Sequence, residues 1–280
     1  MAAMTEHKAR IVILSDTHMG RPRASVRRPE MLRPLWRGAS SLVINGDAAE
    51  IHNPHYRVHA AEQVLRLHDL CELDGVELKM LSGNHDPYIS DVRHLLLADG
   101  RVFVTHGDVL HPAIAPWCAT AARVRAAHDR AMARLEPETR RQLATRLSVS
   151  QHASNEHWTD FQKALMRPVT GEVARRPWMV LRVLWYWLSV PKLAADFAAE
   201  HAPDARFFVF GHTHRQGVWR RGGLTFINTG SFDFPGRPRA VVIENRQLSV
   251  HAILRRGDAF RFNERPLTRL DLDAPPRQDG

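Results

Sequence analysis

Side chains of the types that bind metal ions occur at five places in the sequence, each directly after a short apolar run. Along the chain they form the blocks Asp-x-His, Gly-Asp, Gly-Asn-His-Asp, His-Gly-Asp and Gly-His-x-His. The candidate ligands in these blocks are Asp16, His18, Asp47, Asn84, His106, His212 and His214. Oxygen and imidazole donors without a thiolate suit Mn²⁺, Fe or Zn²⁺, and seven such donors exceed what one ion needs.

This donor set predicts two divalent metal ions, of which Mn²⁺ is the first expectation. A pair of ions about 3.5 to 4 Å apart can hold a phosphoryl group and lower the pKa of a shared water, so that hydroxide forms near neutral pH. That chemistry hydrolyses phosphoester or phosphoanhydride bonds. Side chains at positions i and i+2 of an extended segment point the same way. Asp16 with His18, and His212 with His214, can therefore each present two ligands to one side.

The apolar runs before these blocks predict buried strands at residues 11–14, 42–44, 76–81, 102–104 and 207–210. Apolar residues at helical spacing predict a helix over 58–73, and the alternation of strands with helices predicts an α/β core. Ligands usually bind at strand ends in such sheets. Further strands are expected at 218–219, 224–227, 240–243 and 248–253, where they complete a sheet or sandwich.

A long segment without strand patterns, residues 111–201, interrupts this arrangement. It is rich in Ala, Arg and Leu, and we expect a helical insertion that acts as a lid over a core made of residues 1–110 and 202–262. Residues 263–280 are polar and contain three prolines, which predicts a flexible tail.

The composition excludes a disordered, a collagen-like and a coiled-coil protein. With 280 residues, 44% hydrophobic and 25% charged, the chain has globular composition. Its two cysteines, Cys71 and Cys118, do not form a disulfide framework. The amino terminus lacks a signal-peptide pattern, and residues 178–190 are too few for a spanning helix, so we expect a cytoplasmic protein. A net charge of +9 favours phosphates, anionic lipid or nucleic acid as partners.

The five blocks, in this order, resemble the calcineurin-like metallophosphoesterase superfamily. The resemblance implies a four-layer αββα sandwich of two mixed sheets. It assigns one ion to Asp16, His18, Asp47 and His214, and the other to Asp47, Asn84, His106 and His212, so that Asp47 bridges the two.

The same resemblance implies a catalytic role for one further histidine. His85 would contact the substrate phosphate, to stabilise charge or to protonate the leaving oxygen. Glu50 would orient His85, with Asp86 and Asp108 as alternatives for that role.

The insertion also resembles the lid of the UDP-2,3-diacylglucosamine pyrophosphatases of lipid A precursor synthesis. That resemblance implies a lipid-linked substrate and peripheral contact with an anionic membrane on its inner face. Residues 178–190, rich in Trp and Leu, would then bind lipid, or they form the core of the lid. A different lipid or a nucleotide diphosphate is an alternative substrate.

Three further residues are candidates for substrate binding. Arg21 and Arg23 lie in a basic segment, 20–38, that follows the first block and could bind a second phosphate, although a solvated basic face is the alternative. His111 follows His106 closely. A nuclease of the same fold, with nucleic acid as a less favoured partner, and a non-catalytic metal-binding scaffold are the rival functions. No obligate protein partner is expected.

Overall fold

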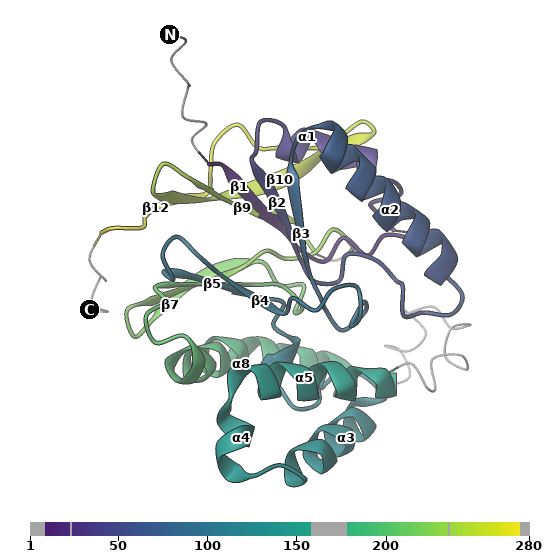
Figure 1. Ribbon diagram of the computed structural model, residues 1–280, viewed down its shortest axis with the longest axis vertical. Helices are drawn as coiled ribbons and strands as arrows, with labels where there is room; N and C mark the ends of the chain where they lie inside the picture. The colour runs from purple at the N-terminus through teal and green to yellow at the C-terminus, as the bar shows by residue number, and fades with distance from the viewer. Residues whose placement is uncertain (1–8, 23, 158–177, 235, 275–280) are drawn as a thin grey trace.

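Two mixed β-sheets lie face to face between two layers of helices in the computed structural model (Figure 1). The structure describes residues 9–22, 24–157, 178–234 and 236–274. Arg23 therefore lies outside the described residues, as does part of the expected insertion.

The first sheet has the strand order β11-β10-β9-β1-β2-β3, with β12 also paired to β10. Its central strands β1, β2 and β3 run parallel to one another, whereas β9 is antiparallel to β1. The strands are β1 (Ile11–Leu14), β2 (Ser41–Asn45), β3 (Glu77–Leu81), β9 (Arg239–Glu244), β10 (Gln247–Arg256), β11 (Ala259–Phe262) and β12 (Thr268–Asp271).

The second sheet has the order β4-β5-β6-β8-β7. Strands β5, β6 and β8 are parallel, and β4 and β7 are antiparallel strands at the two edges. The strands are β4 (His94–Leu97), β5 (Val102–Thr105), β6 (Phe207–Phe210), β7 (Gly217–Arg221) and β8 (Leu224–Asn228).

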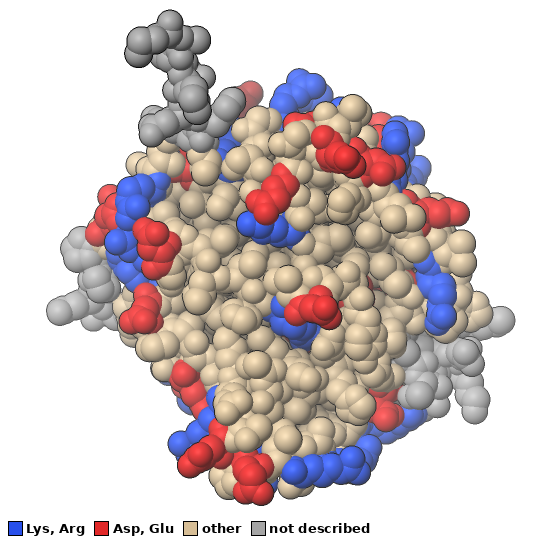
Figure 2. Space-filling model, viewed as in Figure 1, with Lys and Arg blue, Asp and Glu red and all other residues tan. Residues whose placement is uncertain are grey.

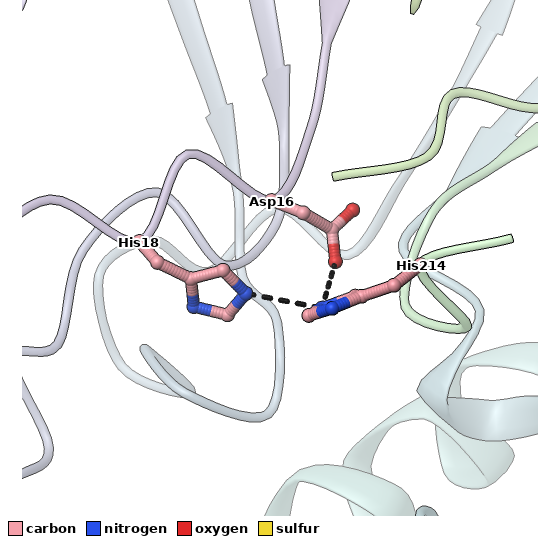
Figure 3. A group of neighbouring side chains, drawn as sticks. All are labelled: Asp16, His18 and His214. Carbon is pink, nitrogen blue, oxygen red and sulfur yellow. Dashed lines mark hydrogen bonds and ion pairs between the residues drawn. The ribbon is translucent and has the colours of Figure 1, made fainter. Parts of the chain in front are cut away.

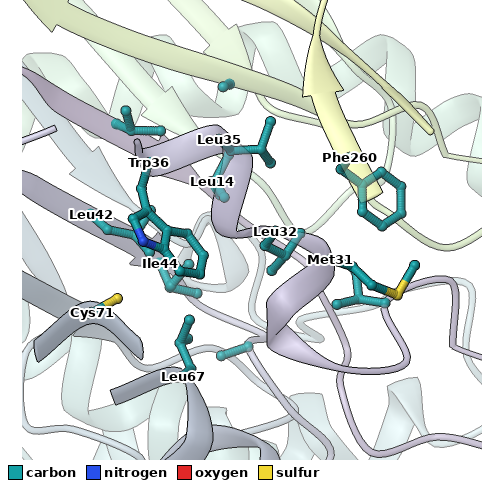
Figure 4. Packing of buried hydrophobic residues seen from close by; sticks show 14 of the residues in the cluster. Leu14, Met31, Leu32, Leu35, Trp36, Leu42, Ile44, Leu67, Cys71 and Phe260 are labelled. Carbon is teal, nitrogen blue, oxygen red and sulfur yellow. The ribbon is translucent and has the colours of Figure 1, made fainter. Parts of the chain in front are cut away.

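The central strands of both sheets are buried on both faces. Their sequences are therefore continuous apolar runs, in which apolar residues do not alternate with polar ones. In β1, Ile13 points into the core between the two sheets, while Val12 and Leu14 point outward. Val12 and Leu14 belong to an apolar cluster on the outer face of the first sheet. This cluster includes Trp36, which Figure 4 shows close to Leu14. The second sheet likewise turns Phe208 outward.

Helices complete the outer layers on both sides (Figure 1). The first sheet is covered by η1 (Pro29–Met31), α1 (Arg33–Trp36) and α2 (Arg57–Leu73). Between β5 and β6 the described residues form η2 (Asp108–Leu110), α3 (Ala121–Ala133), α4 (Pro137–Arg141), α5 (Leu143–Ser154), η3 (Asn155–His157) and α8 (Trp178–His201). None of the helices in the described ranges is long and apolar enough to cross a membrane.

The αββα architecture is the one predicted, and the helix over 58–73 is confirmed with a start at Arg57. The carboxyl-terminal half of α8, however, packs on the second sheet through Val190, Ala194 and Phe197, so it forms the fourth layer of the sandwich. The prediction of a flexible tail is wrong for Thr268–Asp271, because this segment pairs with β10 and buries Leu272 just beyond it.

Candidate metal centre

The metal-type side chains follow the carboxyl ends of parallel strands from both sheets. Asp16 follows β1, Asp47 follows β2, Asn84 follows β3, His106 follows β5 and His212 follows β6. Backbone hydrogen bonds tie these loops together. The Asp16 N–H donates to Gly46 O at 3.1 Å, and the Gly211 N–H donates to His106 O at 2.9 Å. The two sheets therefore bring all five loops to one end of the sandwich.

Asp16, His18 and His214 form a first group of donor atoms, shown in Figure 3. His214 Nε2 lies 3.2 Å from His18 Nε2 and 3.3 Å from Asp16 Oδ1. Glu50 Oε1, at 3.0 Å, accepts the Nδ1–H of His18, which leaves the Nε2 lone pair facing the group. Two nitrogens bound to one ion at about 2.0–2.1 Å lie about 2.9–3.4 Å apart, so the spacing fits a shared cation.

Asp47, His106 and His212 form a second group of donor atoms. The Nδ1–H of His106 donates to Asn45 O at 2.9 Å. Its Nε2 lies 3.3 Å from Asp47 Oδ2 and 3.3 Å from Asn84 Oδ1. The ring is thus held through one nitrogen by the backbone and presents the other to the group, as in metal-binding histidines.

His212 lies between two oxygen acceptors. Its Nδ1 is 2.8 Å from Asn84 Oδ1, and its Nε2 is 3.0 Å from the carbonyl oxygen of Ile114. Burial, together with the positive charge of His106, lowers the pKa of His212 to about 4, so the ring is neutral at pH 7 and carries one N–H. Nδ1 and Asn84 Oδ1 would both be satisfied if they held a cation, with Nε2–H donating to Ile114 O.

The Asp47 carboxylate lies between the two groups. Its Oδ2 is 3.3 Å from His106 Nε2 and 3.9 Å from His18 Nε2, and the residue is almost fully buried. Its Oδ1 accepts the backbone N–H of His85 at 2.8 Å, which fixes the plane of the carboxylate. Asp47 Oδ2 therefore faces both donor groups, in the position where two neighbouring cations would share it.

The backbone of the predicted ligands adopts an uncommon conformation. Asp16, His18, Asp47, His212 and His214 all have φ between +46° and +63°. Residues other than glycine rarely adopt this left-handed region, and such strain persists where the surrounding structure enforces it, often at functional sites. The strain lets each side chain turn back toward the other loops.

Two glycines allow this close approach. A Cβ atom at Gly83 would lie 2.2 Å from Asp47 Oδ1, and one at Gly211 would lie 2.2 Å from Asp16 Oδ2. Since no larger residue fits at either position without moving a carboxylate, the glycines of the sequence blocks belong to the geometry of the centre.

A third donor group consists of His18, Glu50 and His85. Its positive partner is the side chain of Arg21. Arg21 Nη2 lies 2.5 Å from Glu50 Oε1, and His85 Nδ1 lies 3.2 Å from Glu50 Oε2. Burial alone would raise the pKa of Glu50, but His85 and Arg21 hold it well below its usual range. The Arg21 guanidinium therefore supplies the positive charge that balances the carboxylate of this group.

The electrostatics of the second group also favour a cation. Burial opposes the charged form of Asp47, yet His106 and His85 hold its pKa well below the usual range. Burial would lower the pKa of His106, but Asp47 raises it to about 10. Buried carboxylates are normally paired or bound to metal, and here a proton on His106 is the partner that a metal ion would displace. The residues fit two divalent ions.

Glu50, the first candidate for orienting His85, contacts that ring, whereas Asp86 and Asp108 have other partners. Asp86 accepts backbone N–H groups at 2.6–3.3 Å; their donors are Asp47, Ala48, Ala49 and Gly83. Asp108 pairs with Arg93 Nη2 at 2.7 Å. Asp86 thus fixes the loops after β2 and β3, and Asp108 connects the helical segment to β4.

The three predicted substrate-binding residues are placed differently. Arg21 is engaged by Glu50 and by Asp233, whose Oδ2 lies 3.0 Å from Nη1. His111 accepts the N–H of Ala113 at 3.0 Å through Nδ1 and packs against Tyr186. Arg23 lies outside the described residues.

Sequence reasoning did not identify Asp233 or Ile114 as parts of the centre. Asp233 lies 212 residues from Arg21 in the chain, and no motif connects the two. Ile114 acts through its backbone carbonyl, which every residue type has, so its side chain gives no signal. Only the fold brings these two residues to the site.

No protein-family model matches the chain, and no curated protein matches it. Among solved structures, the chain is similar to Vacuolar Protein Sorting 29 from Cryptosporidium parvum, at 11% identity over 94% of this chain and 98% of that chain, with a TM-score of 0.47. It is similar to Yfce, a phosphoesterase from E. coli, at 18% identity over 94% and 100%, with a TM-score of 0.42. It is also similar to a dimetal phosphatase from Danio rerio, at 12% identity over 91% and 98%, with a TM-score of 0.45.

Proposed function

We propose that this protein is a metal-dependent phosphohydrolase with a dinuclear centre, of the calcineurin-like type. The convergence of two donor groups on either side of the Asp47 carboxylate is the observation that carries the proposal. One ion would be held by Asp16, His18, Asp47 and His214, and the other by Asp47, Asn84, His106 and His212. When bound, two divalent ions, with Mn²⁺ preferred and Fe or Zn²⁺ as alternatives, supply Lewis-acid activation of a phosphoryl group and of water.

His85 is the residue of this chain that would contact the substrate. Its side chain is 24% exposed, beside almost fully buried neighbours, and its Nε2 lies 4.0 Å from Asp47 Oδ2. Burial lowers the pKa of His85, but Glu50 and Asp47 outweigh that effect and raise the pKa above its usual value, which favours the protonated ring. A protonated His85 can stabilise phosphoryl charge or donate a proton to the leaving oxygen.

Glu50 would orient His85 and His18 together, since its carboxylate contacts Nδ1 of both rings. Arg21 and Asp233 extend this arrangement, because the Arg21 guanidinium lies between the two carboxylates. Arg21 is therefore proposed to hold Glu50 in position, in addition to any contact that it makes with phosphate.

An apolar surface on a helix that contacts the centre supports an amphiphilic substrate. On the amino-terminal half of α8, Trp185 is 60% exposed and Leu188 is 77% exposed, and further apolar side chains there are exposed as well. The indole N–H of Trp187 donates to Thr213 O at 3.0 Å, between His212 and His214, so the helix that carries this surface contacts a candidate metal-binding loop. We propose a lipid-linked phosphate or pyrophosphate as substrate, with UDP-2,3-diacylglucosamine as the first compound to test.

In this proposal α3, α4, α5 and the amino-terminal half of α8 serve as a lid, and the exposed part of α8 is the region that would touch acyl chains or an anionic membrane. The nuclease alternative requires a basic groove. On the face shown in Figure 2, basic and acidic side chains of the described residues lie beside one another and form no continuous basic stripe.

A substrate screen with matched variants tests the proposal. Manganese-loaded protein is offered a chromogenic phosphodiester, UDP-2,3-diacylglucosamine and single-stranded DNA. We expect hydrolysis of the diester and the nucleotide lipid, loss of both with His106→Ala, and retention of both with His68→Ala, which removes an exposed histidine of α2. Metal binding without any turnover would instead identify a non-catalytic scaffold, and cleavage of DNA alone would overturn the lipid-linked substrate.

A further inference from the structure

The loop that carries His212 and His214 is held by the helical segment between β5 and β6 as well as by the sheet. Ile114 O lies 3.0 Å from His212 Nε2. Two further bonds join α8 to the same loop, because Trp187 Nε1 donates to Thr213 O at 3.0 Å and Arg215 Nη1 donates to Trp187 O at 2.9 Å. The segment therefore contacts the metal centre at its backbone and at one imidazole.

Ile114 has the backbone conformation that is least expected of its residue type. Its φ is +56°, and a β-branched residue in this region is a clear outlier. The turn that contains it is closed by the Ile114 N–H, which donates to His111 O at 2.7 Å, and by the Ala113 N–H, which donates to His111 Nδ1 at 3.0 Å. This turn directs the Ile114 carbonyl toward His212.

The side chain of Ile114 fixes this turn to the helices. It is 1% exposed and packs in a small apolar cluster with Val124 and Ala127 of α3 and Ala153 of α5. A single residue thus has its side chain in the core of the helical segment and its carbonyl oxygen at a candidate metal ligand. Movement of α3 or α5 would be transmitted to His212 through it.

The contact with Ile114 matters because either ring nitrogen of His212 could carry the proton and donate it to a neighbouring oxygen. A neutral ring carries one N–H, and both neighbouring oxygens, Asn84 Oδ1 at 2.8 Å and Ile114 O at 3.0 Å, can accept it. If Nδ1 carried the proton, it would point at Asn84 and close the position of the second ion. With Ile114 O held in place, the proton is retained on Nε2 and the Nδ1 lone pair stays directed at that position.

We propose that Ile114 is a positioning residue for the second metal ion, and that through it the packing of α3 and α5 sets the affinity of that ion. This inference rests on the proposed dinuclear function, but its test does not depend on turnover. Ile114 contacts neither substrate nor metal in this account, and it acts only through His212.

The test combines metal titration with the tautomer of His212. In Ile114→Ala the strained backbone loses its side-chain anchor, and we expect the dissociation constant of the second Mn²⁺ to rise at least about tenfold, as for other partners of metal-binding histidines. The first ion should be affected less than twofold. Ile114→Val, which keeps most of the packing, should restore near wild-type binding.

Two controls separate positioning from general stability. Leu67→Ala truncates a buried side chain of α2, which covers the other sheet, and should lower the melting temperature without changing either dissociation constant. Nitrogen NMR of ¹⁵N-histidine-labelled, metal-free protein should show the Nε2–H tautomer of His212 in the wild type and a mixture of tautomers in Ile114→Ala.

The outcomes are distinguishable. Equal affinity for both ions in Ile114→Ala and wild type, or an unchanged tautomer in the variant, overturns the role of Ile114 and leaves the dinuclear centre intact. Wild-type protein that binds no second ion contradicts the proposed function, and in that case the tautomer measurement still decides whether Ile114 orients His212. A shift in the tautomer together with selective loss of the second ion supports the inference.

Discussion

Arg21 Nη2 lies 2.5 Å from the buried Glu50 carboxylate, and this ion pair supplies the positive charge within the third donor group. Because Glu50 also contacts His18 and His85, the position of one guanidinium affects both a candidate metal ligand and the candidate general acid. Arg21, shortly after the first candidate metal-binding block, is thus paired with two carboxylates, those of Glu50 and Asp233.

If Arg21 acts by holding Glu50, then Asp233→Asn should have the same effect as Arg21→Gln. Both changes loosen the guanidinium, so we expect kcat to fall by about tenfold with KM changed less than twofold. Steady-state kinetics on the chromogenic diester measures this split. A large rise in KM for Arg21→Gln, with Asp233→Asn unaffected, would show that Arg21 binds the substrate phosphate instead.

Gly83→Ala should weaken metal binding because the added Cβ would lie 2.2 Å from Asp47 Oδ1. Overpacking of this kind costs roughly 1–3 kcal/mol, so we expect at least about fivefold weaker binding of Mn²⁺, measured by calorimetric titration. The control is Gly75→Ala, where a Cβ meets nothing within 4 Å but φ is +67°, so that only stability should fall, by about 1 kcal/mol. Unchanged metal affinity in Gly83→Ala would contradict the placement of Asp47.

Metal binding should release a proton from His106. The pKa of this residue is raised to about 10 in the metal-free protein, so at pH 8 the ring is protonated and must lose that proton to bind a cation. The affinity for Mn²⁺ should therefore rise with pH up to about pH 10. Calorimetry in buffers of different ionisation enthalpy counts the protons, and zero release at pH 8 would be inconsistent with His106 as a ligand.

The raised pKa of His106 also makes the stability of the metal-free protein depend on pH. Since the folded pKa of His106 lies above its unfolded value, the protonated ring stabilises the metal-free protein fully below about pH 6.5, and this contribution is lost as the pH rises toward 10. Denaturant unfolding should show that His106→Gln removes this part of the pH dependence.

Asp86→Asn tests how much the hydrogen bonds of Asp86 stabilise the loops after β2 and β3. The Asp86 carboxylate accepts backbone N–H groups of Asp47, Ala48, Ala49 and Gly83, and an amide can accept fewer of them. We expect a loss of about 1–3 kcal/mol in the free energy of unfolding. The exposed Asp91, changed to Asn in the same way, should leave stability within error. Equal stability of the two variants would show that these bonds contribute little.

The parts of the fold nearest the centre were the most predictable from sequence. Strands β1 and β6 begin and end where the apolar runs predict, because a strand buried on both faces has a continuous apolar sequence. The edge strands β4, β11 and β12 were not predicted. Each is four residues long with mixed burial, and each depends on pairing with a neighbour that sequence patterns do not reveal.

The meeting of the candidate ligands at one end of the sandwich was predictable because the blocks combine residue type with position after a strand. The contacts that connect these residues could not be predicted. The left-handed backbone of Asp47, the ion pair of Arg21 with Glu50 and the contact of the Ile114 carbonyl with His212 form only when distant loops meet. The burial of α8 was also beyond the sequence. Its aromatic residues include both buried Tyr186 and exposed Trp185, and helical spacing alone does not say which side faces the sheet.

The central claim is that two cations bind on either side of Asp47. Anomalous scattering from crystals of the manganese-loaded protein tests it most directly. We predict two anomalous peaks, one contacted by Asp16, His18 and His214 and one by Asn84, His106 and His212, with a carboxylate oxygen of Asp47 shared between them. A single peak remote from Asp47, or none at saturating Mn²⁺, Fe and Zn²⁺, would contradict the account.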